Sequence, residues 1–117
     1  MLNIDMSDDR ADILRGTLDL LILKTLDTLG PLHGYGIAQR IQQVSGSMLS
    51  LNQGTLYPAL LRLEQRAWIR SKMGVSDNKR KARFYALTAA GRRQLQLETA
   101  DWLRASAIIN GILATRA

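Results

Sequence analysis

One pair of strand-like segments lies between helical segments in this sequence, and it limits the folds open to the chain. Residues 68–73 (Trp-Ile-Arg-Ser-Lys-Met) and 82–87 (Ala-Arg-Phe-Tyr-Ala-Leu) alternate apolar and polar side chains, and the polar residues 74–81 connect them. This alternation is typical of a β-hairpin. We therefore expect a single hairpin, placed after three helices and before a fourth.

Two helical patterns open the chain. Residues 13–29 are apolar most of the way round a helix, which indicates burial on more than one side. Gly30 and Pro31 end this helix, because proline cannot continue it. Residues 34–44 form a shorter amphipathic helix, whose inward positions repeat at i, i+4 and i+7: Ile37, Ile41 and Val44.

The third helix is predicted from about Asn52 to Arg66. Its inward stripe is formed by Leu56, Leu60, Leu63 and Ala67. Asn52 can cap it, because an asparagine side chain accepts a bond from a free backbone N–H of the first turn. Pro58 leaves two starts open. A start at Asn52 puts Pro58 in the second turn, at the cost of one hydrogen bond, whereas a start at Thr55 puts it in the tolerated first turn.

A long last helix is predicted from the cap Thr88 to about Leu113. Leu95, Trp102 and Ile109 recur a heptad apart on one face. No later element is available to cover this face, so it must be buried elsewhere. Pairing with the same helix of a second chain, together with the apolar first helix, predicts a symmetric dimer.

Charge is unevenly distributed along the 117 residues. The chain has 16 Lys and Arg against 10 Asp and Glu, and residues 62–93 hold ten basic and only two acidic residues. Such a concentration indicates a polyanionic partner. Residues 1–12 form an acidic lead without the apolar run of a signal peptide. The longest apolar stretch, residues 20–23, is far too short to span a membrane, so we expect a cytoplasmic protein with no membrane partner.

The order of elements predicts a mainly α (α+β) fold, a winged helix-turn-helix with an added C-terminal dimerisation helix. The second of the two short helices is then the recognition helix of the major groove, and the basic hairpin is the wing beside it. We expect a flexible lead over residues 1–12, a DNA-binding domain over 13–88 and a dimerisation helix over 89–117.

Five short blocks, spaced along residues 13–113, resemble the PadR family of bacterial transcriptional regulators. They are Gly16-Thr-Leu-Asp-Leu20, Gly30-Pro-Leu-His-Gly-Tyr35, Gly54-Thr-Leu-Tyr-Pro58, Arg62-Leu-Glu64 and Tyr85-Ala-Leu-Thr-Ala-Ala-Gly91. The resemblance implies a homodimer, most often a repressor, that binds a dyad operator and in many members releases DNA when a small effector binds.

The single C-terminal helix is similar to that of the compact subgroup that includes multidrug-sensing repressors. In that subgroup a tryptophan on the last helix stacks against flat aromatic ligands at the dimer interface, and Trp102 matches its position. One departure concerns the wing, where many relatives have a Gly-Gly-Arg tip and this chain has Asp77-Asn78-Lys79-Arg80. The positive charge is kept, but the turn geometry is not implied by the resemblance.

The candidate site residues fall into three groups. Residues at the start of the third helix are candidates for base contacts: Gln53, Thr55 and Tyr57. Residues expected at phosphates are Tyr35, Asn52, Arg62, Lys79, Arg80 and Lys81. Residues expected at a dimer interface or an aromatic effector site are Leu14, Leu18, Leu95, Trp102 and Ile109.

Each of these roles competes with a structural one. Thr55 can merely begin the helix, and Tyr57 can be a half-buried ring whose hydroxyl meets backbone. Arg62 can pair with a local carboxylate instead of a phosphate. Trp102 can fill a dimer core without lining an effector site. The lone His33 is expected to pack a turn.

The predicted partners are therefore double-stranded DNA, a second copy of the chain and a small aromatic effector. The competing hypothesis is a protein-interaction module that presents its basic face to an acidic protein or an anionic surface. An enzyme is not expected, because no nucleophile–base pair, metal constellation or phosphate loop can be assembled. The chain has no cysteine, so no disulfide or thiolate zinc site can form, and we expect no cofactor and no metal.

Overall fold

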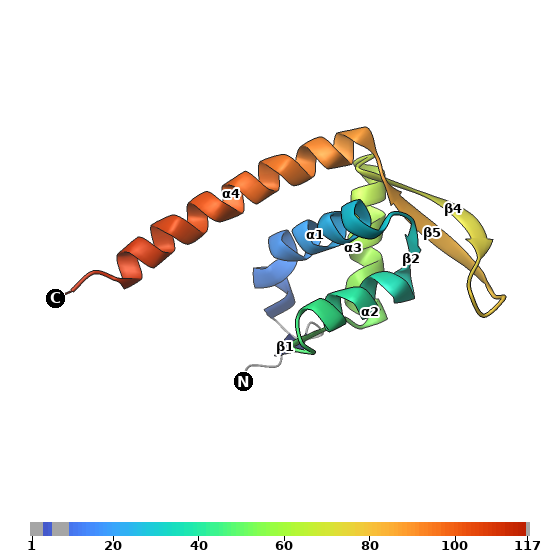
Figure 1. Cartoon of the computed structure of the whole chain (residues 1–117), viewed down its shortest axis with the longest axis horizontal. Coiled ribbons are helices and arrows are strands. Elements are labelled where there is room, and N and C mark those ends of the chain that lie inside the picture. Colours follow the sequence, from blue (N-terminus) through green and yellow to red (C-terminus); the bar gives the residue numbers. More distant parts are fainter. Residues whose placement is uncertain (1–3, 6–9, 117) are drawn as a thin grey trace.

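The computed structural model describes the backbone at residues 4–5 and 10–116, and the side chains from residue 17 to 116. The described residues form four helices and five strands, arranged as Figure 1 shows. In chain order they are β1 (Ile4–Asp5), α1 (Arg10–Leu29), β2 (Leu32–His33), α2 (Gly34–Val44), β3 (Leu49–Ser50), α3 (Gln53–Gln65), β4 (Ile69–Val75), β5 (Lys81–Leu87) and α4 (Ala89–Leu113).

The start of the chain departs from the expected acidic lead. Helix α1 begins at Arg10 instead of residue 13, and Ile4–Asp5 pair in parallel with Leu49–Ser50 of the loop before α3. The other residues of the lead, 1–3 and 6–9, lie outside the described residues. This two-residue pairing has no alternating pattern from which the sequence could predict it.

The hairpin is confirmed, and a third strand extends it. Strands β4 and β5 pair antiparallel from Ile69↔Leu87 to Val75↔Lys81, so both are longer than the alternating segments predict. Strand β2 pairs on the other side of β5, in the order β2-β5-β4. The hairpin projects beyond the helices, and its turn lies far from the body of the molecule (Figure 1).

The hydrophobic core lies among α1, α2 and α3, with two strand residues, Ile69 and Tyr85, and one residue of α4, Leu95. Its fully buried side chains include Ile22, Leu23 and Leu26 of α1, Ile37 of α2, Leu56, Leu60 and Leu63 of α3, and Ile69 of β4. Two predicted inward positions are wrong. Val44 is 70% exposed at the end of α2. Ala67 is exposed beyond the end of α3, with a positive φ of 60°.

The caps that the sequence predicts set where two helices begin. Asn52 Oδ1 accepts a hydrogen bond from the Thr55 N–H at 2.9 Å, so α3 begins at Gln53 and Pro58 lies in its second turn. Thr88 Oγ1 accepts a bond from the Gly91 N–H at 2.9 Å at the start of α4. Both caps satisfy N–H groups that have no partner inside the helix.

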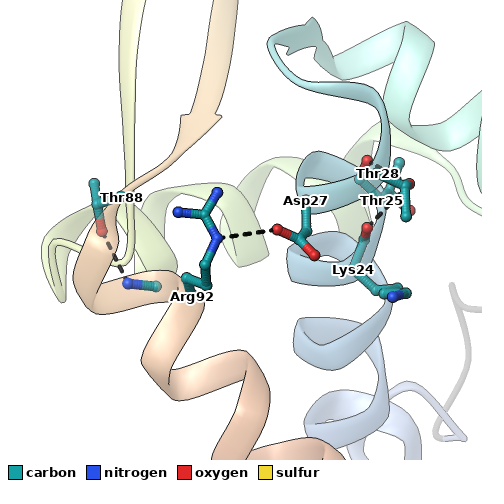
Figure 2. A network of polar contacts seen from close by, with 7 residues as sticks. Lys24, Thr25, Asp27, Thr28, Thr88 and Arg92 are labelled. Atoms are coloured by element: carbon teal, nitrogen blue, oxygen red, sulfur yellow. Dashed lines mark hydrogen bonds and ion pairs between the residues drawn. The ribbon is translucent and has the colours of Figure 1, made fainter.

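A tight junction joins α4 to the hairpin and to α1. A Cβ on Gly91 would lie 1.9 Å from the carbonyl oxygen of Trp68, so only glycine fits where α4 passes the start of β4. Figure 2 shows Thr88 at this helix start, and the Arg92 Nε–Asp27 Oδ1 ion pair, 3.2 Å long, that links α4 to α1.

Beyond Leu95, which is buried in the core, α4 leaves the rest of the molecule. Figure 1 shows its second half extending away from the other helices. Its large apolar side chains are exposed there: Leu97, Trp102, Leu103, Ile108, Ile109, Ile112 and Leu113. Side chains of this kind are rarely left so exposed along a whole helix face unless another surface covers them.

Candidate nucleic-acid interface

An open groove lies between the helix pair and the hairpin. The start of α2, the start of α3 and the turn side of the hairpin form its walls. The side chains that carry its chemistry are Tyr35 and Gln39 from α2, Gln53 and Tyr57 from α3, and Arg80, Lys81 and Arg83 from the hairpin. Hydrogen-bonding amides, two phenols and three cations therefore face one open surface.

The start of α3 forms one wall of this groove. Because Asn52 caps the helix from outside, Gln53 stands in its first turn with an exposed side chain. Thr55 is half-buried, its N–H bonds to the Asn52 side chain, and it is not among the groove-lining residues that the structure describes. That position agrees with a role in starting the helix.

Tyr57 lies where α3 crosses the start of α2. A Cβ on Gly34 would come within 2.7 Å of the Tyr57 hydroxyl, so the absence of a side chain at Gly34 makes room for the ring. The Tyr57 side chain is still 43% exposed and faces the groove. Tyr35, in the first turn of α2, is exposed beside it, near the positive end of that helix dipole.

His33 has the turn-packing role that the sequence predicts. Its Nδ1 accepts a hydrogen bond from the Gly36 N–H at 2.9 Å and caps α2. Its ring meets Phe84 of β5 edge-on, with 5.4 Å between the ring centroids. The imidazole therefore fixes the start of α2 against the sheet.

The hairpin turn carries the basic residues in a defined conformation. The Lys79 N–H bonds to the Ser76 carbonyl at 2.9 Å, and the Ser76 N–H bonds to the Arg80 carbonyl at 2.8 Å. Lys79 has a φ of 62°, a left-handed conformation that glycine adopts most easily. The resemblance left the turn geometry undefined, and the structure places the left-handed backbone conformation of the turn at Lys79.

Arg62 does not face the groove. Its Nη2 donates to Asp19 Oδ1 of α1 at 2.7 Å, and both side chains are largely buried. Arg62 follows Gln53 by nine residues, which is about half a turn round the helix at 3.6 residues per turn. The phosphate contact expected of Arg62 is therefore replaced by an ion pair between α3 and α1.

The five residues expected at a dimer or effector surface are not brought together in one chain. Leu18 and Leu95 are buried in the core, 3% and 6% exposed. Trp102 and Ile109 are 50% and 55% exposed on the free half of α4. The side chain of Leu14 lies outside the described residues.

The sequence missed two groove residues, Gln39 and Arg83. A helical signal for Gln39 existed, because it follows Tyr35 by four residues and so lies on the same face of α2. Arg83 could have been found by counting two residues back from Tyr85, since alternate strand residues share a face. The three consecutive cations at residues 79–81 give a stronger charge signal than the single Arg83 on the strand.

Tyr85 is the buried residue of β5 on the face turned toward α3. Burial raises the pKa of its phenol, and the nearby Tyr57 and Glu64 raise it further, whereas Arg83 lowers it. Tyr85 therefore stays neutral under ordinary conditions and packs as a core side chain, while Arg83 provides the positive charge beside it.

Neither a metal-binding cluster nor a membrane-spanning helix occurs among the described residues. None of their His, Asp and Glu side chains forms a group of three or more that could hold a metal ion. None of the helices described is long and apolar enough to cross a membrane.

The helix pair and the antiparallel hairpin beside it define a winged helix-turn-helix fold. A model of the PadR-like family of transcriptional regulators matches residues 22–97. The chain therefore belongs to the PadR-like family, whose members are DNA-binding transcriptional regulators and not enzymes.

Individual relatives agree with this assignment. The fold is similar to that of a transcriptional regulator from Clostridium thermocellum, with a TM-score of 0.77 and 29% identity over 86% of this chain and 96% of that one. A PadR family regulator from Eggerthella lenta gives a TM-score of 0.77 and 26% identity over 95% and 94% of the two chains. An uncharacterised protein of Lysinibacillus sphaericus is 30% identical over 101 residues, 86% of this chain and 92% of its own length.

Proposed function

We propose that this regulator is a homodimeric repressor that binds a dyad operator through the groove, and that a small aromatic molecule releases it. The observation that carries the DNA-binding part is the groove itself. Exposed Gln53 and Tyr57 at the start of a helix stand beside the cations of the wing, so base-reading and phosphate-binding groups share one surface.

The roles within the groove follow from chemistry. Gln53 is proposed to read a base edge, because a glutamine amide can bond adenine bidentately. Tyr57 and Tyr35 offer hydroxyl donors, and Asn52 keeps its amide N–H groups for a phosphate while its Oδ1 caps α3. Thr55 is proposed only as a secondary contact, because it lies half-buried behind them.

The wing is proposed to bind the DNA backbone. Lys79, Arg80 and Lys81 are exposed at and beside the turn, where a duplex docked on α3 comes close. Neutralising phosphates releases condensed counterions, so binding of this kind weakens steeply as salt rises.

The dimer is supported by the shape of the single chain. The chain exposes 8108 Å², whereas a compact protein of its mass exposes about 6,300 Å². Its radius of gyration is 15.6 Å, against about 13.4 Å for a compact domain of this length. The free half of α4 contributes to this excess, and a second copy can bury its apolar side chains.

The effector is proposed to bind at Trp102. This indole is half-exposed on α4, among side chains that a dimer would enclose, and flat aromatic molecules stack on such rings. The resemblance to multidrug-sensing members supports the same site.

Selection from a random duplex pool at two salt concentrations tests the DNA-binding proposal. We expect an enriched dyad with half-sites about one helical turn apart. Replacing Lys79, Arg80 and Lys81 by Gln should lower the slope of log K against log salt by about three for each subunit of the bound dimer, near 0.9 for each lost phosphate contact. Gln53→Ala should relax the preference at one base position of each half-site.

Three outcomes would contradict parts of the proposal. Salt-sensitive binding with no enriched sequence would indicate a non-specific role. An unchanged slope in the triple variant would remove the wing from the interface. Absence of binding at both salts would favour the interaction-module hypothesis.

For the effector, a flat cationic dye should quench Trp102 fluorescence and weaken operator binding, and Trp102→Ala should abolish the effect on DNA.

A further inference from the structure

A carboxylate, a hydroxyl and a guanidinium form a chain of hydrogen bonds between α3 and the hairpin. Ser71 Oγ of β4 donates to Glu64 Oε2 of α3 at 2.6 Å. Arg83 Nη1 of β5 donates to the same Ser71 Oγ at 3.1 Å. Ser71 lies opposite Tyr85, two residues from Arg83, so both side chains point to the α3 side of the sheet.

The hydroxyl between the two charged groups has a specific consequence. None of the ion pairs found among the described residues involves Arg83, so its charge is not cancelled by direct contact with a carboxylate. The Ser71 hydroxyl donates its hydrogen to Glu64, so the lone pairs of its oxygen are directed toward Arg83. Donating this hydrogen bond also makes the oxygen a better acceptor. Ser71 can therefore orient the guanidinium without neutralising it.

Arg83 is placed where its guanidinium can bind an anion in the groove. Arg83 is exposed and lines the same groove as Gln53 and Tyr57. A guanidinium has five N–H donors in a planar fork, so one bond to Ser71 leaves others for a planar or tetrahedral anion. The anion that reaches this groove in a DNA complex is a backbone phosphate.

We propose that Arg83 binds a DNA phosphate at the base of the wing, and that Ser71, held by Glu64, is the positioning residue that aims it. This inference rests on the proposed DNA-binding function. It adds a phosphate contact from the sheet, next to the recognition helix, to the contacts proposed for the turn residues.

The test measures binding to a mixed-sequence duplex as salt is varied, with full-length variants. Arg83→Gln should lower the slope of log K against log salt by about one for each bound subunit. Ser71→Ala should weaken binding roughly three- to tenfold, the usual effect of one hydrogen bond. Combined with Arg83→Gln, it should weaken binding no further, because its effect acts through Arg83. Ser71→Thr keeps the hydroxyl and should restore binding.

Lys72→Gln is the matched control, since Lys72 pairs with Phe84 and points to the opposite face of the sheet. It removes one charge from the same hairpin and should leave the slope unchanged. Melting temperatures of all variants should stay close to the wild type, so that changes in binding are not changes in folding.

The outcomes separate this inference from the function on which it rests. If the wild-type chain shows no salt-dependent binding, the proposed function fails and the inference falls with it. If the wild type binds and Arg83→Gln keeps its slope, only the inference is overturned. If Ser71→Ala weakens binding equally with and without Arg83, Ser71 supports the fold and does not position the guanidinium.

Discussion

One residue of the hairpin turn, Lys79, has a strained backbone conformation. Lys79 adopts a φ of 62° in the hairpin turn, a conformation that glycine adopts most easily. A side chain in this region costs about 1 kcal/mol or more, because its Cβ crowds the following carbonyl. The chain accepts that cost at the one turn position where it also places a cation.

Lys79→Gly and Lys79→Ala should separate backbone strain from charge. Both remove one cation, but only glycine relieves the left-handed conformation. We expect Lys79→Gly to be more stable to urea than Lys79→Ala by about 1 kcal/mol. Both should lose the same increment of salt dependence in DNA binding. Equal stabilities of the two variants would show that the turn relaxes to another conformation.

Glu98 of α4 is a second residue with an unfavourable environment. Its Oε2 is buried without a hydrogen-bond partner among the described residues. Burial raises the pKa of its carboxyl, and Asp19 and Asp101 raise it further, against a hydrogen bond from Gln94 and the charge of Arg66. Folding therefore favours the protonated form of Glu98 relative to the unfolded chain.

This raised pKa predicts how stability changes with pH. Because the folded pKa of Glu98 exceeds the unfolded one, its contribution is complete below the ordinary pKa and is lost as the pH rises through the folded value. Glu98→Gln should lack that loss. The free energy of unfolding of the variant, relative to the wild type, should therefore rise between acidic and neutral pH. Parallel pH profiles in urea unfolding would contradict the prediction.

The elements that the sequence predicts well are those with strong periodicity and capping residues. Asn52 and Thr88 mark the starts of α3 and α4, and Gly30 ends α1, because each satisfies or releases backbone groups in a way that its neighbours cannot. Strand β2 was missed because two residues carry no alternation. The charge of Arg62 leaves both a phosphate contact and a local ion pair open, and its angular position on α3 places it beside Asp19.

The free half of α4 is the element with the clearest consequence for assembly. Ile109→Asp would put a carboxylate in the face that a second copy is proposed to bury. Burial of an unpaired charge costs several kcal/mol, so self-association should weaken by about 100-fold or more. Sedimentation velocity measures this directly.

Ala107→Asp is the matched control on the same helix. Residues 107 and 109 point to nearly opposite sides of an α-helix, so this variant should keep the wild-type association. If both variants associate like the wild type, the stripe of Trp102 and Ile109 is not the interface.

The whole molecule has more surface than its mass requires. The exposed apolar side chains of α4 add to the stability of the chain only when a second surface buries them. Association of folded chains stabilises them by mass action, so the melting temperature should rise with protein concentration. Calorimetry over a hundredfold range of concentration checks this. An unchanged melting temperature would indicate that the single chain is stable as it stands.

Helix α4 is held at its start, near Gly91, while its far end is free of the rest of the chain. The start of the helix packs against the Trp68 carbonyl at Gly91 and is linked to α1 by the Arg92–Asp27 ion pair, so it is held against both elements. Its 25 residues span about 37 Å, so a tilt of only about 5° displaces the far end by about 3 Å. In a dimer held at the far ends, the same tilt would change the distance between the two DNA-reading helices. In such a dimer, the close fit of Gly91 against Trp68 would therefore affect the spacing of the two recognition helices.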